Sequence, residues 1–155
     1  MKWQTLKAFW IYKLKALQQS NPVLEAGLLQ SIAQSINQQR PTYKTRFLIR
    51  RSDQLYAVKC QDIAYFAFEN RLTYLFTHDG KRHISESVLD ELERQLNPQM
   101  FFRLNRQCIT NIDAIDKVHN HFNGKLKVDL LPTHHEAGFM VSREKAPVFK
   151  DWMNM

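Results

Sequence analysis

The hydrophobic period of the chain changes near Thr45, and this change limits the possible folds more than any other feature. Before it, apolar side chains recur every three or four residues, as in Trp3, Leu6, Trp10, Leu14 and Leu17 and then Leu24, Leu28, Ile32 and Ile36. After it, apolar and polar residues alternate. Spacings of three and four predict amphipathic helices, whereas a spacing of two predicts strands. We therefore expect a helical segment followed by a mainly β domain.

The helical segment is expected to form one helix over residues 3–19 and another from residue 22 to about residue 38. Asn21-Pro22 separates them, because Asn can cap a helix and Pro suits the first helical position. The polar stretch Gln38-Gln39-Arg40-Pro41-Thr42 is typical of a linker. The sequence therefore predicts a helical segment over residues 1–43 and a separate domain over residues 44–155.

Antiparallel strands joined by short turns are predicted after Thr45. Turn signals at Ser52-Asp53, Asp79-Gly80 and Asn123-Gly124 interrupt alternating segments. The wholly apolar run Tyr65–Phe68 predicts a buried strand. The strands are expected around residues 46–50, 55–58, 65–68, 72–77, 118, 126–130 and 139–141.

Short helices are also predicted within this domain, which makes its fold class mainly β with some α (α+β). One helix follows an apparent capping box at residues 87–90. The other closes the chain and begins near Arg143 or Glu144, because Pro147 must lie in its first turn. Their expected inward residues are Leu89, Leu92, Leu96, Phe149 and Trp152.

Composition favours a cytoplasmic protein with a polyanionic partner. The net charge is +7 and the pI is about 9.5, which permits a nucleic-acid partner without proving one. We expect neither a membrane span nor a secretion signal, and Cys60 and Cys108 are expected to be reduced core thiols. An acidic element is expected to lie away from any bound DNA, and its residues are Glu86, Asp90, Glu91 and Glu93.

The stretch from Phe101 to Asn111 is the most suggestive of DNA binding. Arg and Asn side chains, which recognise base edges and phosphates, alternate there with apolar residues that would anchor them to a core. An ordinary strand and loop with solvated charges explains the same spacing. From the residues alone, both interpretations stay open.

Catalysis and metal binding have little support. The six histidines have no accompanying cysteine or HExxH spacing, so we expect no metal site and no cofactor. Ser142–Lys145 matches S-x-x-K, but the other motifs of that enzyme class are missing. None of the four glycines lies in a phosphate-binding loop. The sequence therefore predicts a protein that is not an enzyme and has no membrane partner.

From Phe47 to Trp152 the chain resembles the LytTR DNA-binding domain of bacterial response regulators. Its most specific stretch, Phe102-Arg103-Leu104-Asn105-Arg106 through Ile109-Thr110-Asn111-Ile112, resembles the family's F-x-R-x-H/N-R-S-x-I-V-N, with departures at Gln107 and Thr110. The other matching segments occur in the family's order, and they are Asp62–Phe66, Asp79–Lys81, Leu89–Leu92 and Val141–Arg143.

This resemblance implies a fold of short antiparallel sheets that docks loops, rather than a recognition helix, into two successive major grooves. It implies base contacts from the Asn105-Arg106 loop and from Arg143. The loop containing Asn70 and Arg71 would reach toward the second groove. Lys145 would hold phosphate near the start of the last helix. For Arg71 and Lys145, plain solvation is the alternative.

The resemblance also implies the biological setting, which is a cytoplasmic two-component system. A dimer would bind direct repeats in double-stranded DNA, with a receiver domain and a sensor kinase acting upstream. Residues 1–40 are too short for a receiver, so we interpret them as a receiver's last helix and linker in an excised fragment. A free-standing protein with its own dimerising helix is the alternative.

Other functions stay possible at this point. A protein-interaction module could keep a LytTR-like fold without binding DNA. A ligand-sensing or catalytic domain is the remaining alternative.

Overall fold

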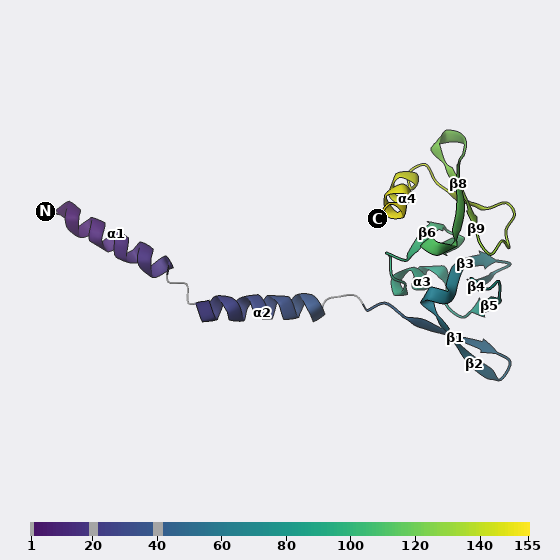
Figure 1. Ribbon diagram of the computed structural model, residues 1–155, viewed down its shortest axis with the longest axis horizontal. Coiled ribbons are helices and arrows are strands. Elements are labelled where there is room, and N and C mark those ends of the chain that lie inside the picture. The colour runs from purple at the N-terminus through teal and green to yellow at the C-terminus, as the bar shows by residue number, and fades with distance from the viewer. Residues whose placement is uncertain (1, 19–21, 39–41) are drawn as a thin grey trace. The chain divides into compact units, whose positions relative to one another are not determined.

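The computed structural model describes residues 2–18, 22–38 and 42–155 (Figure 1). The chain divides into two units, residues 1–41 and 42–155. The first contains the helices α1 (Lys2–Gln18) and α2 (Pro22–Gln38), which confirms the helical period of this segment. Trp3 and Trp10 of the apolar stripe are 82% and 60% exposed. Asn21 and residues 39–41 of the predicted linker lie outside the described residues.

The second unit is built mainly from strands. Its α-helices are α3 (Leu89–Gln95) and α4 (Ala146–Met153). The strands are β1 (Arg46–Arg51), β2 (Gln54–Lys59), β3 (Ile63–Glu69), β4 (Leu72–Thr77), β5 (Arg82–Ser85), β6 (Phe101–Asn105), β7 (Cys108–Asn111), β8 (Ile115–Asn120), β9 (Leu126–Leu130) and β10 (Phe139–Val141).

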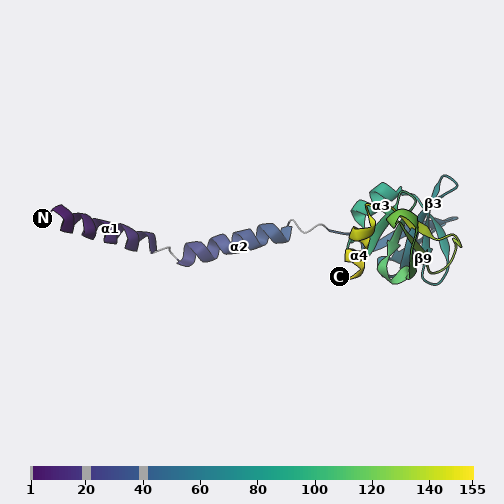
Figure 2. The same ribbon diagram turned by 90° about the horizontal axis from the view of Figure 1, so that it is seen from above.

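These strands form three antiparallel sheets. A five-stranded sheet in the order β5-β4-β3-β7-β6 occupies the middle of the unit. The ribbon β1-β2 lies on one side of it, and the three-stranded sheet β10-β9-β8 lies on the other (Figure 1 and Figure 2). The mainly β architecture with short helices agrees with the predicted fold class.

The central sheet is buried on both faces. Tyr65 and Phe66 are adjacent in β3 and almost fully buried, yet they belong to different apolar clusters. Tyr65 packs with residues of β9, β10 and α4. Phe66 packs with Phe47 of β1 and Leu92 of α3. Side chains alternate across a strand, so β3 supplies apolar residues to both layers.

Several local predictions are corrected by the structure. The capping box is wrong, because α3 begins at Leu89 and its N-cap is Val88, with no side-chain hydrogen bond. Helix α4 begins at Ala146, two residues later than expected, although Pro147 does lie in its first turn. Phe68, expected in a buried strand, is 44% exposed near the end of β3. Some polar residues are buried because both faces of the sheet are covered, and Thr73 is one of them.

Two polar side chains of this core, those of Asn111 and Trp152, donate to backbone oxygens. Asn111 is fully buried, and its Nδ2 donates to the backbone oxygen of Ile63 at 2.9 Å. Its Oδ1 accepts from the backbone nitrogen of Asp113 at 3.1 Å. The indole nitrogen of Trp152 donates to the backbone oxygen of Pro98 at 2.8 Å, which fastens α4 to the connection before β6.

Replacing Asn111 by Ala should lower the free energy of unfolding by about 1–3 kcal/mol, because a buried carbonyl and a backbone N–H both lose their partner. Denaturant unfolding followed by circular dichroism measures the change. Asn120→Ala on exposed β8 is the matched control and should stay within about 0.5 kcal/mol of the parent. Equal losses in both variants would contradict the assigned role of Asn111.

Candidate nucleic-acid interface

Two hairpin turns lie next to each other at one end of the central sheet. One is the β3–β4 turn at Asn70-Arg71, and the other is the β6–β7 turn at Arg106-Gln107. Strands β3 and β7 pair up to Ala67 opposite Cys108. The backbone nitrogen of Phe68 then donates to the oxygen of Gln107 at 2.8 Å. The structure therefore brings two of the predicted contact loops together.

The β3–β4 turn projects its side chains away from the domain. Asn70 and Arg71 have φ angles of 49° and 65°, and positive φ at both central residues is the requirement of a tight type I′ hairpin. Both residues are exposed, and neither side chain has a partner within the described part of the chain. The preceding Glu69 carboxylate bonds His135, so the base of the turn is fastened to the β9–β10 loop.

Asn105 has hydrogen-bond partners within the protein. Its Nδ2 donates to the backbone oxygen of Met140 at 2.9 Å, and its Oδ1 accepts from the nitrogen of Gln107 at 2.7 Å. Both ends of the amide are therefore occupied within the protein. Asn105 fastens the β6–β7 turn to β10, and Arg106 is left as the exposed side chain at the tip.

Arg103 holds the backbone of the same turn. Its Nε donates to the oxygen of Asn105 at 2.6 Å, and its Nη2 donates to the oxygen of Arg106 at 3.2 Å. Its Nη1 lies 3.1 Å from carboxylate oxygens of both Asp90 and Glu93. These acids are exposed, and Arg103 is the enclosed partner. The acidic helix was the signal that could have revealed this role.

The segment between β10 and α4 contributes Arg143 and Lys145. The aliphatic part of Arg143 lies over the β8–β9 turn, where a Cβ on Gly124 would come within 3.2 Å of the Arg143 Cγ. Lys145 immediately precedes α4 and is partly buried, with its Nζ 5.6 Å from the centre of the Phe102 ring. Burial lowers the pKa of Lys145, while the nearby Glu93 carboxylate opposes this shift.

A surface hollow joins part of the predicted site to the acidic helix. Arg106 and Lys145 line it together with Asp90 and Glu93, whereas Asn70, Arg71 and Arg143 do not. Two residues of the acidic element therefore lie beside two of the predicted contact residues. Because Arg103 bonds both carboxylates, part of their negative charge is offset before any ligand arrives.

Other features bear on the remaining predictions. Cys60 and Cys108 are buried free thiols, as expected, and burial raises the pKa of each. Within residues 2–18, 22–38 and 42–155, no three His, Cys, Asp or Glu side chains are grouped so that they could hold a metal ion. No helix in the described ranges has the length and apolar character needed to cross a membrane.

Comparison with protein families assigns most of the second unit. The model of the LytTr DNA-binding domain matches residues 53–154, which is well over half of the chain. The chain belongs to the LytTR family. This match confirms the resemblance inferred from the motifs, and it identifies a DNA-binding family of transcription regulators rather than an enzyme class.

LytTR relatives include an uncharacterized response regulatory protein of Vibrio cholerae serotype O1, 26% identical over 108 residues. The match covers 68% of this chain and only 41% of that relative, which is therefore much longer than the matched region. A solved LytTr DNA-binding domain comes from a Bacillus cereus protein described as a methyl-accepting/DNA response regulator. It is 18% identical with a TM-score of 0.59, and the match covers 72% of this chain and 99% of that domain.

Replacing Arg103 by Ala should lower the free energy of unfolding by about 2 kcal/mol, because backbone oxygens of the LytTR domain's β6–β7 turn lose a charged donor. Arg106→Ala, in the same turn, should stay within about 0.5 kcal/mol, because its side chain forms no hydrogen bond or ion pair in the described part of the chain. Parallel denaturant titrations compare the two variants. Similar stability losses would show that Arg106, too, is part of the folded framework.

Proposed function

We propose that residues 44–155 bind double-stranded DNA sequence-specifically, as the output domain of a two-component response regulator that controls transcription. One observation carries the proposal. The backbone around Arg106 is held by Arg103 and Asn105, while the Arg106 side chain is exposed and has no partner among the described residues. Membership of a DNA-binding family supports the same partner.

A held backbone with a free guanidinium suits the recognition of a base. Arginine can donate two parallel hydrogen bonds to O6 and N7 of guanine in the major groove. The backbone of the turn is ordered before binding, so less conformational entropy is lost when Arg106 makes this contact. We propose that Asn105 acts indirectly, by positioning Arg106, because its own amide is already bonded to the backbone of Met140 and Gln107.

The other proposed contacts surround this turn. Arg143 enters the major groove from the β10–α4 segment, with its aliphatic part supported by Gly124. Asn70 and Arg71, on the neighbouring hairpin, reach the DNA beside it. Lys145 bonds a phosphate near the amino terminus of α4, where the helix dipole also favours negative charge. Because the proposed partner is DNA, we also propose that the protein is cytoplasmic. The proposed function requires no cofactor and no membrane partner.

Residues 1–43 are proposed to bring two copies together on direct repeats. Apolar side chains of α1 and α2 are exposed along both helices, and a face of this kind is covered in solution by another surface. A receiver domain and a sensor kinase act upstream in the full-length protein. The longer Vibrio cholerae relative, described as a response regulatory protein, supports this arrangement.

Replacing Arg106 or Arg143 by Ala should weaken binding to the specific duplex roughly tenfold to a hundredfold, because one arginine–guanine contact contributes ~1–3 kcal/mol. The specific duplex is first obtained by selection from a random DNA pool. Titrations on the selected and a scrambled duplex are then measured at several salt concentrations, since phosphate contacts weaken as salt rises.

Arg46→Ala is the matched control, because Arg46 is exposed on β1 and has no side-chain partner within the described ranges. It should bind both duplexes like the parent. If Arg106→Ala and Arg143→Ala also bind the selected duplex like the parent, neither residue recognises a base. If even the parent selects no sequence, the domain is an interaction module that does not recognise DNA.

Removing residues 1–41 should leave a folded domain of lower apparent mass, because the exposed apolar faces of α1 and α2 are lost with them. Light scattering on the full chain and the truncated chain, at equal concentration, compares their masses. The full chain should be a dimer and the truncated chain a monomer. Two monomers would exclude dimerisation through this segment, and two dimers would place the interface in residues 42–155.

A further inference from the structure

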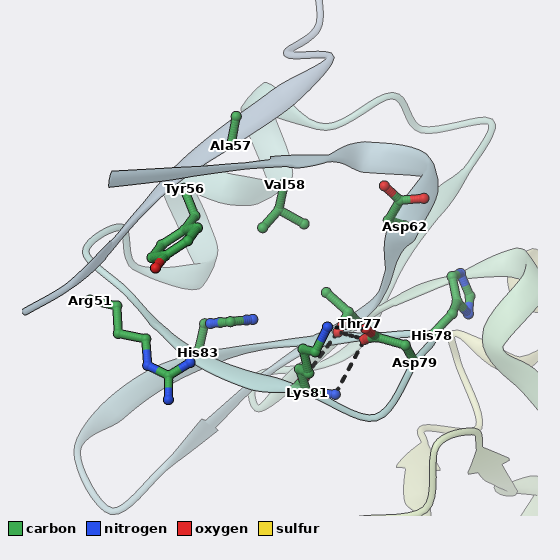
Figure 3. Close-up of a pocket in the computed structure, with 10 residues that line it drawn as sticks. All are labelled: Arg51, Tyr56, Ala57, Val58, Asp62, Thr77, His78, Asp79, Lys81 and His83. Carbon is green, nitrogen blue, oxygen red and sulfur yellow. Dashed lines mark hydrogen bonds and ion pairs between the residues drawn. The ribbon is translucent and has the colours of Figure 1, made fainter. Parts of the chain in front are cut away.

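A second polar hollow lies at the other end of the central sheet. Strand β4 runs from Leu72, beside the Asn70-Arg71 turn, to Thr77 at this hollow. Its volume is about 490 Å³, within the range of small-molecule sites. Figure 3 shows its walls, which come from the β1–β2 ribbon and from the β4–β5 hairpin. At ~3.3 Å per residue, β4 separates the two ends of the sheet by roughly 20 Å.

Cationic and hydrogen-bonding groups from separate segments meet here. Arg51 lies at the end of β1, Lys81 in the β4–β5 turn and His83 in β5, and all three line the hollow with Tyr56 (Figure 3). The side chains of Arg51 and His83 form no hydrogen bond or ion pair within the described residues. Their donors are therefore available to a ligand without breaking contacts of the fold.

The positive charge extends into an adjoining hollow. Arg51, Lys81 and His83 line both spaces, and the second adds Arg50 and Arg82 without any carboxylate. The guanidinium of Arg82 lies over the Tyr74 ring, with 4.5 Å between its carbon and the ring centre. Across both hollows, four Lys and Arg residues face two Asp residues. Arg51 and Lys81 balance Asp62 and Asp79 in the first hollow, so the excess positive charge comes from Arg50 and Arg82 of the second.

The two carboxylates of the first hollow differ in their partners. Asp79 lies 2.7 Å from the Lys81 ammonium and also accepts from Thr77. These hydrogen bonds, that of Lys81 foremost, lower the pKa of Asp79 to about 2, so it is ionised and already partnered. Asp62 has no side-chain partner in the described ranges and lies on the far side of the hollow from Arg51 (Figure 3). It can accept from hydroxyl or amino groups of a ligand.

An apolar wall completes the hollow. Tyr56, Ala57 and Val58 of β2 line it opposite the polar β4–β5 turn. Mixed walls of this kind suit a molecule with a charged group and a less polar body. The Tyr56 hydroxyl already donates to Gln54, so the donors offered to a ligand are those of the arginine, lysine and histidine. Phosphate has several acceptor oxygens, which match these donors better than the two oxygens of a carboxylate.

We propose that this hollow binds a small organic phosphate monoester, with the phosphate at Arg51, Lys81 and His83 and the organic part against β2. The site is independent of DNA recognition, because it lies at the opposite end of β4 from the contact turns. It gives the domain a ligand of its own, separate from any signal relayed by a receiver.

Nuclear magnetic resonance titration of the full chain tests the site with three probes, which are adenosine 5′-monophosphate, adenosine and inorganic phosphate. Adenosine 5′-monophosphate should shift amide signals of residues 51, 56 and 81–83 and leave those of residues 70, 71 and 106 unchanged. Inorganic phosphate should shift the same signals at higher concentration. Adenosine alone should shift none, because the phosphate provides the charged contacts.

Arg51→Gln should weaken binding of adenosine 5′-monophosphate roughly tenfold to a hundredfold, because one charge-assisted contact is lost. His83→Gln is a second variant at the same site, and Arg46→Gln on the same ribbon is the matched control, expected to bind like the parent. Thermal melting confirms that each variant is folded, and affinity for the selected DNA duplex should be unchanged in all three.

Three results would overturn the proposal. One is the absence of any shift with both phosphate-bearing probes at millimolar concentration. Another is an equal loss of affinity in Arg46→Gln, which would indicate general attraction to a basic surface. The last is competition for these signals by scrambled duplex DNA at its non-specific affinity, which would make the hollow part of a nucleic-acid surface.

Discussion

Strand β3 is buried on both faces, and the remaining layers of the domain depend on this double burial. Tyr65 and Ala67 face the β8–β10 sheet and α4, whereas Ile63 and Phe66 face the β1–β2 ribbon and α3. Burial of large apolar side chains is the dominant favourable contribution to such a fold. Because both faces are covered, the sheet can contact ligands only through its strand ends, its turns and its edges.

The strand ends show how a rigid sheet supports exposed side chains. At one end, Arg103 and Asn105 use their polar atoms on the backbone of the β6–β7 turn, and Arg106 is left exposed. The acids of α3 complete this arrangement by holding Arg103. Positioning and exposure are thus divided between neighbouring residues of one short motif, which would let a loop recognise DNA in the way that we propose.

The opposite end of the sheet has a different character. There the ribbon β1–β2 and the β4–β5 hairpin enclose a hollow with Arg51, Lys81 and His83, instead of an exposed tip. Strand β4 connects the two ends directly, and its central residues Leu75 and Phe76 are fully buried. A ligand in the hollow and DNA at the turns would therefore contact opposite ends of one packed strand.

Periodicity and turn signals were enough to predict the helical segment, the strands other than β5, β6 and β7, and the inward residues Leu89, Leu92, Phe149 and Trp152, because these depend on neighbours in the chain. Contacts between distant segments could not be predicted in this way. The bond from Asn105 to Met140, the support of Arg143 by Gly124 and the placing of α3 acids beside Arg106 all join separate elements. The sequence by itself determined which side chains carry charge and where most of the strands form. Only tertiary packing decided which of those charges hold the fold and which stay free to bind, because that depends on what lies opposite each strand.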